Sequence, residues 1–165
     1  MRKCLFVLIA LAGAATLSAQ KPAWAPPPGH LTLPLWPHGA PGGTPDLPPE
    51  VDATTAKDGL VAGKAVIRLG NVSKPTLTLY KPVGRNTGAA VVVFPGGGYH
   101  ILAIDLEGTE VCSWLASKGV SCVLVKYRVP NTGPYPKSAA ALQDAQRAIG
   151  MVRAHAAQWR INPHK

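Results

Sequence analysis

The chain has 165 residues, 47% of them hydrophobic, with 17 glycines, 17 prolines and a formal net charge of +9 at pH 7. The basic residues are scattered and form neither a run nor a stripe interleaved with aromatic side chains, which argues against nucleic-acid binding and predicts only a general attraction to anionic surfaces. The histidines and cysteines are dispersed without metal-ligand spacing, so no metal ion and no other cofactor is expected.

The first 20 residues have the layout of a secretory signal peptide. Arg2 and Lys3 precede an apolar run over residues 5–15, and the small residues Ser18 and Ala19 come after it. The apolar run is shorter than the roughly 20 residues that a membrane-spanning helix needs. We therefore expect residues 1–19 to be a signal peptide, the protein to be secreted or periplasmic, and no stable membrane insertion after the signal is removed.

Residues 20–60 are expected to be a proline-rich lead-in segment. Ten prolines lie between residues 21 and 49, and they exclude a helix there. The bulky Leu35 and Trp36 favour packing of part of this segment against the domain, whereas its composition is equally compatible with a disordered tail. Ordered structure is expected to begin near Val61, so that residues 61–165 form the folded domain.

The elements of this domain alternate between strand and helix. Residues 65–69 and 75–80 are predicted to form a leading antiparallel pair of strands. The apolar strand 90–94 is expected to be covered on both faces, as in a parallel sheet. Next come a helix at 107–117, a buried strand at 120–125 and a long helix that Ser138 caps and that ends near Asn162. This order predicts an α/β fold with three layers and right-handed crossovers.

The strand 90–94 leads into Pro95, three glycines, Tyr99 and His100. A phosphate-binding loop is excluded because no lysine follows at the required spacing, and Ile101 breaks a dinucleotide-binding fingerprint. The stretch matches better the glycine-rich oxyanion loop that comes after a strand in α/β-hydrolases, with proline in place of histidine. A glycine turn without any ligand is the alternative.

Two cysteines lie outside the predicted signal peptide. Cys112 falls in the predicted helix and Cys122 in the next strand, ten residues apart. A disulfide is compatible with an exported protein, but buried free thiols are the commoner state at such positions, and we expect free thiols here.

Several acidic residues have both a catalytic and a structural interpretation. Asp144 is expected to form an ion pair within its helix, with Arg147, or to contact Arg128. Three further acids, Asp105, Glu107 and Glu110, suit either the paired carboxylates of a glycosidase or the acidic start of a helix, and the second is the commoner arrangement.

Six motifs together resemble a known family. They are Pro95-Gly96-Gly97-Gly98-Tyr99, Asp105-Leu106-Glu107-Gly108, Trp114-Leu115-Ala116, Lys126-Tyr127-Arg128-Val129-Pro130, Tyr135-Pro136 and the helical stretch from Gln143 to Ile149. This set is similar to the N-terminal half of secreted α/β-hydrolase esterases of the feruloyl or acetylxylan esterase-like group. That group is related to hormone-sensitive-lipase-type carboxylesterases, and its members sometimes carry the name endo-1,4-β-xylanase.

The resemblance implies a three-layer α/β-hydrolase fold and assigns roles to the glycine loop. Gly97 and Gly98 are expected to donate one N–H of the oxyanion hole. In the whole enzyme, a bulky replacement of either is expected to lower kcat by roughly 100-fold or more, with little effect on folding. Tyr99 and His100 are expected either to line the acyl pocket or merely to cover the loop.

In this family a Gly-x-Ser-x-Gly elbow comes after the part that the chain resembles, and the acid and histidine of the triad come later still. No such motif occurs in the 165 residues. The chain is therefore expected to be a fragment, truncated before the nucleophile elbow, of an exported serine carboxylester hydrolase that deacylates xylan or its oligosaccharides, and to be inactive by itself. The alternatives are a glycosidase acting on xylan and a non-catalytic truncated binding domain.

Overall fold

The computed structural model describes residues 24–43, 46–130 and 138–164, so the predicted signal peptide and the loop at 131–136 lie outside the described residues. The strands are β1 (Leu31–Pro34), β2 (Val51–Asp52), β3 (Arg68–Gly70), β4 (Thr76–Tyr80), β5 (Ala90–Val93), β6 (Leu102–Ala103) and β7 (Ser121–Lys126). The helices are the π-helix η1 (Asp105–Thr109), α1 (Glu110–Ser117) and α2 (Ala139–Ala154). Within these ranges no helix is long and apolar enough to cross a membrane.

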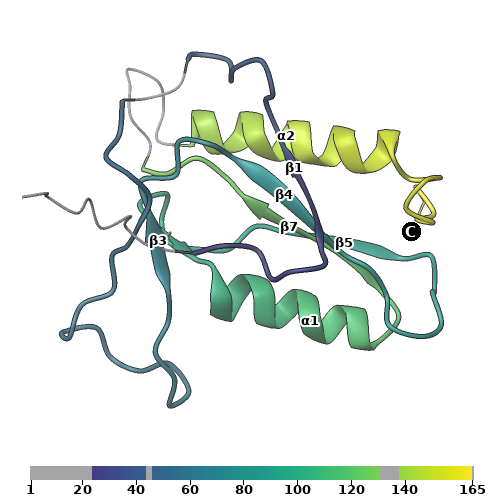
Figure 1. The fold of residues 1–165 in the computed structure, drawn as a ribbon, viewed down its shortest axis with the longest axis horizontal. Coiled ribbons are helices and arrows are strands. Elements are labelled where there is room, and N and C mark those ends of the chain that lie inside the picture. The colour runs from purple at the N-terminus through teal and green to yellow at the C-terminus, as the bar shows by residue number, and fades with distance from the viewer. Residues whose placement is uncertain (1–23, 44–45, 131–137, 165) are drawn as a thin grey trace, which may run out of the picture.

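The main sheet has four strands in the order β1-β4-β7-β5. β5 runs parallel to β7, and the other neighbours are antiparallel. The connection from β5 to β7 contains β6, η1 and α1. Helix α1 lies on one face of the sheet, while α2 covers the opposite face (Figure 1). This arrangement confirms the predicted α/β class with three layers, because each face of an apolar sheet must be buried against another element.

Burial differs between the two parallel strands. The first five residues of β7 are buried, as expected for a strand with neighbours on both sides and helices on both faces. β5 is only partly buried, and Val91 is 39% exposed. The expected full coverage of this strand is not observed, because β5 is the last strand of the sheet within the described residues.

Ordered structure begins well before Val61, contrary to the prediction. β1 lies inside the proline-rich segment and pairs with β4, where its one proline, Pro34, costs little because β1 is an edge strand of the described sheet. Leu35, directly after β1, is fully buried. The Lys126 ammonium also lies 2.7 Å from the Glu50 carboxylate. Part of the proline-rich segment is thus integral to the domain.

The predicted hairpin between residues 65–69 and 75–80 is wrong. β3 belongs to a second, three-stranded sheet of order β2-β3-β6, whereas β4 lies inside the main sheet. Both sides of β4 are occupied, by β1 and by β7, which leaves no edge for β3. The second strand is close to its predicted range, whereas the first overlaps its predicted range only at residues 68–69. Neither strand pairs with the other.

Both predicted helices form, with different limits. The first begins as η1 two residues before the predicted start and continues as α1 to Ser117. The second, α2, ends at Ala154 rather than near Asn162. Ala156 and Trp159 are nevertheless buried in the turns after α2, so their apolar spacing reflects packing against the core.

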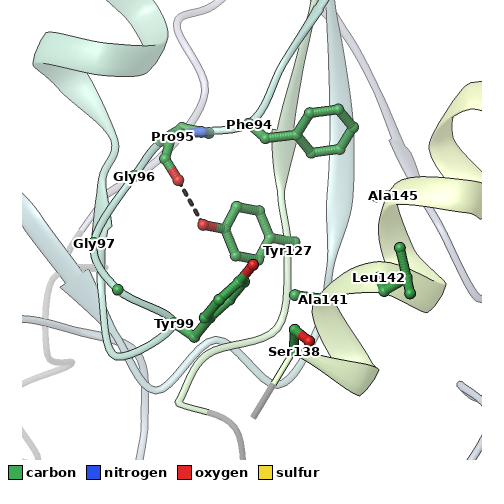
Figure 2. Close-up of a pocket in the computed structure, with 11 residues that line it drawn as sticks. Phe94, Pro95, Gly96, Gly97, Tyr99, Tyr127, Ser138, Ala141, Leu142 and Ala145 are labelled. Carbon is green, nitrogen blue, oxygen red and sulfur yellow. Dashed lines mark hydrogen bonds between the residues drawn. The ribbon is translucent and has the colours of Figure 1, made fainter. Parts of the chain in front are cut away.

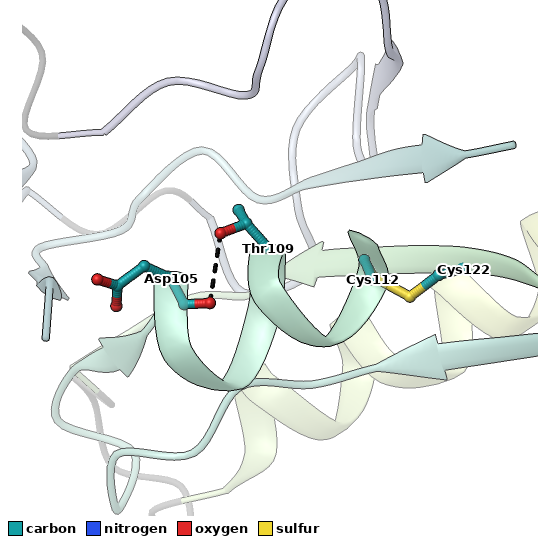
Figure 3. Close-up of a disulfide and its surroundings, with 4 residues drawn as sticks. All are labelled: Asp105, Thr109, Cys112 and Cys122. Carbon is teal, nitrogen blue, oxygen red and sulfur yellow. Dashed lines mark hydrogen bonds between the residues drawn. A yellow bond between two sulfur atoms is a disulfide. The ribbon is translucent and has the colours of Figure 1, made fainter. Parts of the chain in front are cut away.

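Cys112 and Cys122 form a disulfide, and the expectation of free thiols is therefore wrong (Figure 3). Cys112 lies on α1 and Cys122 on β7, with a Cα–Cα distance of 5.1 Å. Both residues are fully buried. The tight turn at Gly119 returns the chain from α1 to β7 and brings the two positions within bonding distance, which the sequence spacing alone did not reveal.

Candidate active site

The glycine loop begins after β5 and adopts conformations that only glycine takes readily. Gly97 has φ +143° and Gly98 has φ +62°. A Cβ atom on Gly97 would collide with the carbonyl oxygen of Ile101, whereas on Gly98 the nearest atom, His100 Cδ2, would be 3.8 Å away. Close packing thus excludes a side chain at Gly97, whereas at Gly98 the backbone conformation only disfavours one.

The loop leaves part of its backbone polar groups unused. The Gly97 carbonyl accepts hydrogen bonds from the N–H groups of His100 and Ile101, at 3.0 and 3.3 Å. Among the described residues, no group accepts a hydrogen bond from the N–H of Gly97, Gly98 or Tyr99. Free N–H groups in a glycine loop are the feature that an oxyanion hole requires.

Tyr127 anchors the start of the loop. It lies directly after β7, and its hydroxyl donates a 2.6 Å hydrogen bond to the carbonyl of Pro95 (Figure 2). Burial raises the pKa of Tyr127 to about 12, and the nearby Tyr99 and Glu107 add to the shift. The hydroxyl therefore remains a protonated donor at neutral pH.

A cavity of about 410 Å³ opens between the glycine loop and the start of α2. Phe94, Tyr99 and Tyr127 contribute aromatic rings to its lining (Figure 2). The remaining lining residues come from the loop and from α2 and its N-cap: Pro95, Gly96, Gly97, Gly98, Ser138, Ala141, Leu142 and Ala145. The glycine loop thus forms one side of the cavity, and apolar and aromatic side chains form much of the rest, a combination common in ligand sites.

Three of the four residues singled out from the sequence lie together at this cavity. Gly97, Gly98 and Tyr99 line it, and Tyr99 takes the unusual φ of +63°. His100 is exposed and is not among the lining residues.

The other eight lining residues, Tyr127 and Leu142 among them, were not predicted from the sequence to lie at a site. Tyr127 belongs to one of the motifs that resemble the esterase family, and no other feature of the sequence indicated a role for it. The apolar spacing of α2 indicated a helix, but it did not show which side would line a cavity.

The three acids considered for glycosidase chemistry each have a structural partner. Asp105 accepts hydrogen bonds from the N–H groups of Ile67 and Leu106, at 2.9 and 2.8 Å. Glu107 accepts one from Gly96 N–H at 2.7 Å. Glu110 lies 3.3 Å from the ammonium of Lys64. These contacts are consistent with the structural interpretation of the three carboxylates.

Asp144 holds α2 to the sheet through a buried ion pair with Arg128, which confirms the second of the two partners considered for it. The Asp144 carboxylate is fully buried and lies 2.9 Å from the Arg128 guanidinium. It also accepts hydrogen bonds from the Arg128 backbone N–H and from the Trp36 indole, at 2.9 and 2.6 Å. Arg147 instead donates to the Leu35 carbonyl, at 3.0 Å. This network positions the start of α2, and with it one wall of the cavity.

Within the described ranges, no group of three or more histidine, cysteine or acidic side chains is arranged to hold a metal ion. The candidate site is therefore a glycine loop with free N–H groups over a partly aromatic cavity, set in a three-layer α/β domain. In α/β-hydrolases this arrangement is the oxyanion side of an active site.

Comparison with known proteins also finds similarity to esterases. The acetylxylan esterase of Xylanibacter ruminicola is 30% identical over 103 residues, which cover 62% of this chain and 20% of that protein. The chain thus spans about a fifth of the length of the curated relative it matches. The resemblance to esterases predicted from the sequence motifs is confirmed. No family model matches the chain.

Solved structures of esterases are also similar to the chain. The acetyl ester-xyloside bifunctional hydrolase of Caldicellulosiruptor lactoaceticus is 30% identical, with a TM-score of 0.48, and the match covers 81% of this chain and 39% of that one. Esterase 2 of Thermogutta terrifontis, phosphoramylated by tabun, is 30% identical, with a TM-score of 0.47 and coverage of 56% and 35%.

Proposed function

We propose that this chain forms the oxyanion side of the active site in a serine carboxylester hydrolase that deacylates xylan or its oligosaccharides. The observation that carries the proposal is that Gly97 and Gly98 line the cavity beyond β5 and that their N–H groups donate to no described residue. The similarity to an acetylxylan esterase supports the ester class and the polysaccharide substrate.

In the proposed reaction, a serine oxygen attacks the ester carbonyl and the carbonyl oxygen becomes an oxyanion. N–H groups of the glycine loop stabilise that charge without reorganising, because the loop backbone is already fixed. A second N–H, from the residue after the serine, completes the hole in enzymes of this class. No Gly-x-Ser-x-Gly motif occurs in the 165 residues, so we place the serine, its histidine and its acid in sequence outside this chain.

The lining of the cavity supports an acylated sugar as the substrate. Phe94, Tyr99 and Tyr127 present rings that suit the apolar face of a sugar or acyl group. A cavity of about 410 Å³ is far larger than an acetyl group needs, and it leaves room for part of the sugar as well.

The test is acetate release from acetylated xylo-oligosaccharides by the full-length protein that contains these residues. We expect acetate release, turnover of p-nitrophenyl acetate, and loss of both after treatment with a serine-directed organophosphate. Release of reducing sugar ends without acetate would instead support the glycosidase alternative. Binding of the oligosaccharide without any turnover would support a non-catalytic domain.

We also propose that the protein is exported. The charged and apolar start of the sequence is the layout of a signal peptide, and the Cys112–Cys122 disulfide suits an oxidising compartment. Mass spectrometry of the exported product should find a mature N-terminus near Gln20 or Lys21. An intact Met1 in the periplasmic or culture fraction would contradict this proposal.

A further inference from the structure

The peptide unit between Pro95 and Gly96 is held by a side chain at each of its polar ends. Its carbonyl oxygen accepts the 2.6 Å hydrogen bond from the Tyr127 hydroxyl. Its N–H donates a 2.7 Å hydrogen bond to the Glu107 carboxylate. Two side chains from different parts of the chain thus form hydrogen bonds with one peptide group. That peptide group immediately precedes Gly97 and Gly98.

The two side chains differ in environment. Tyr127 is buried beside Phe94, with the ring centroids 6.4 Å apart, and its raised pKa keeps it protonated. Glu107 lies on η1 and is exposed. Its carboxylate is packed closely against the loop, because a Cβ atom on Gly96 would come within 2.6 Å of the nearer oxygen.

The held peptide plane matters because it immediately precedes the candidate oxyanion donors. Glycine restricts its own backbone dihedrals less than any other residue, so three in a row give a loop of little intrinsic rigidity. A peptide group is planar, and fixing both of its ends fixes the direction in which the chain leaves it. Oxyanion stabilisation depends on N–H groups that already point at the developing charge.

We propose that Tyr127 and Glu107 are positioning residues that clamp the Pro95–Gly96 peptide and thereby orient the N–H groups of Gly97 and Gly98 toward the oxyanion. This inference rests on the proposed function and adds to it the two side chains on which the geometry of the hole depends. Neither residue takes part in proton transfer or covalent chemistry in this scheme.

The first test is Tyr127→Phe in the full-length protein, with p-nitrophenyl acetate as substrate. The variant keeps the ring and loses only the donor to Pro95, so kcat should fall about tenfold, less than the roughly 100-fold typical of losing an oxyanion donor outright, while KM stays within about twofold. Tyr80→Phe is the matched control. Tyr80 is also buried with a pKa raised to about 12, but no described residue forms a hydrogen bond with its hydroxyl, and kcat should not change.

The second test uses Glu107. Glu107→Ala removes the acceptor for Gly96 N–H and should lower kcat about tenfold, whereas Glu107→Gln retains an acceptor oxygen and should stay within about threefold of the unmodified enzyme. Glu110→Ala is the control, because Glu110 lies in the next turn and its carboxylate, among the described residues, pairs with the exposed Lys64 ammonium and not with the glycine loop.

The double variant Tyr127→Phe with Glu107→Ala distinguishes a clamp from two independent contacts. If both side chains hold one peptide, the second loss should add less than about threefold to the first; independent effects would multiply. A multiplied loss, or unchanged kcat in Tyr127→Phe despite a lower unfolding midpoint, would overturn the clamp while leaving the proposed function standing. Absence of ester turnover in the unmodified full-length protein would overturn both.

Discussion

Gly97 and Gly98 are neighbours with the same proposed role, yet a side chain would meet different surroundings at each. At Gly97 a Cβ atom would overlap the Ile101 carbonyl, which is part of the same loop backbone and cannot swing aside. At Gly98 there is room, and only the left-handed backbone conformation disfavours another residue. The expectation that a bulky replacement at either glycine leaves folding nearly unchanged is therefore wrong for Gly97.

We predict that Gly97→Ala lowers the free energy of unfolding by about 3 kcal/mol, through combined overpacking and backbone strain. Gly98→Ala should lower it by about 1 kcal/mol, the cost of a left-handed conformation for alanine. Urea unfolding of the two variants checks the difference. Equal losses at the two positions would show that the close approach of Ile101 to Gly97 does not exist in solution.

The Asp144–Arg128 pair is the second residue-scale feature open to test. Asp144→Ala would leave the guanidinium of Arg128, a residue that is 4% exposed, without its carboxylate partner. Breaking a buried pair in this way costs about 3–5 kcal/mol of unfolding free energy. The exposed pair of Lys64 with Glu110 supplies the control, because Glu110→Ala should cost less than about 1 kcal/mol. Denaturant unfolding curves of both variants measure the two losses.

At the scale of elements, the disulfide fastens α1 to β7, the most deeply buried strand of the main sheet. α1 is only eight residues long, and helices of that length are marginal without tertiary support. Packing and the disulfide together hold α1 against the face of the sheet opposite α2. Because η1 continues directly into α1, this attachment also supports Glu107 under the glycine loop.

We expect replacement of both cysteines by alanine to lower the free energy of unfolding by about 3 kcal/mol, in proportion to the short loop that the bond closes. The measurement is thermal or urea unfolding of the variant beside the oxidised protein. A reductant should shift the midpoint of the unmodified protein and leave that of the variant unchanged. Equal midpoints for the variant and the oxidised protein would contradict a stabilising disulfide.

At the scale of the whole molecule, β5 presents an open edge within the described residues. Val91 and Phe94 are 39% and 37% exposed, and no described strand pairs with the outer side of β5. An apolar strand edge of this kind pairs readily with other chains. It lies next to the proposed active site, because the glycine loop begins where β5 ends.

A product consisting of this chain alone is therefore expected to aggregate or to bind a dye such as ANS, and to show no ester turnover above background. Size-exclusion chromatography, dye fluorescence and a p-nitrophenyl acetate assay check these outcomes. A monomer that melts cooperatively would show that the β5 edge is stable without a neighbouring strand. Measurable ester turnover would reveal a nucleophile within the 165 residues.

The sequence by itself determined the local features of the fold. The apolar run into three glycines located β5 and its loop, and the 3.6-residue spacing located both helices, because these patterns depend only on neighbours along the chain. The same patterns supported the α/β class, and the motifs identified the resemblance to esterases. Gly97 and Gly98 were singled out for the same local reason, since adjacent glycines mark a backbone that approaches something closely.

Only the tertiary structure decided which distant segments meet. The pairing of β1 with β4, the disulfide between α1 and β7, and the hydrogen bond from Tyr127 to Pro95 each join positions whose spacing in the sequence carries no periodic signal. Such contacts are set by how the helices and the sheet pack as layers, and packing depends on all the elements at once. For that reason the glycine loop could be predicted from the sequence, whereas the two side chains that hold it could not.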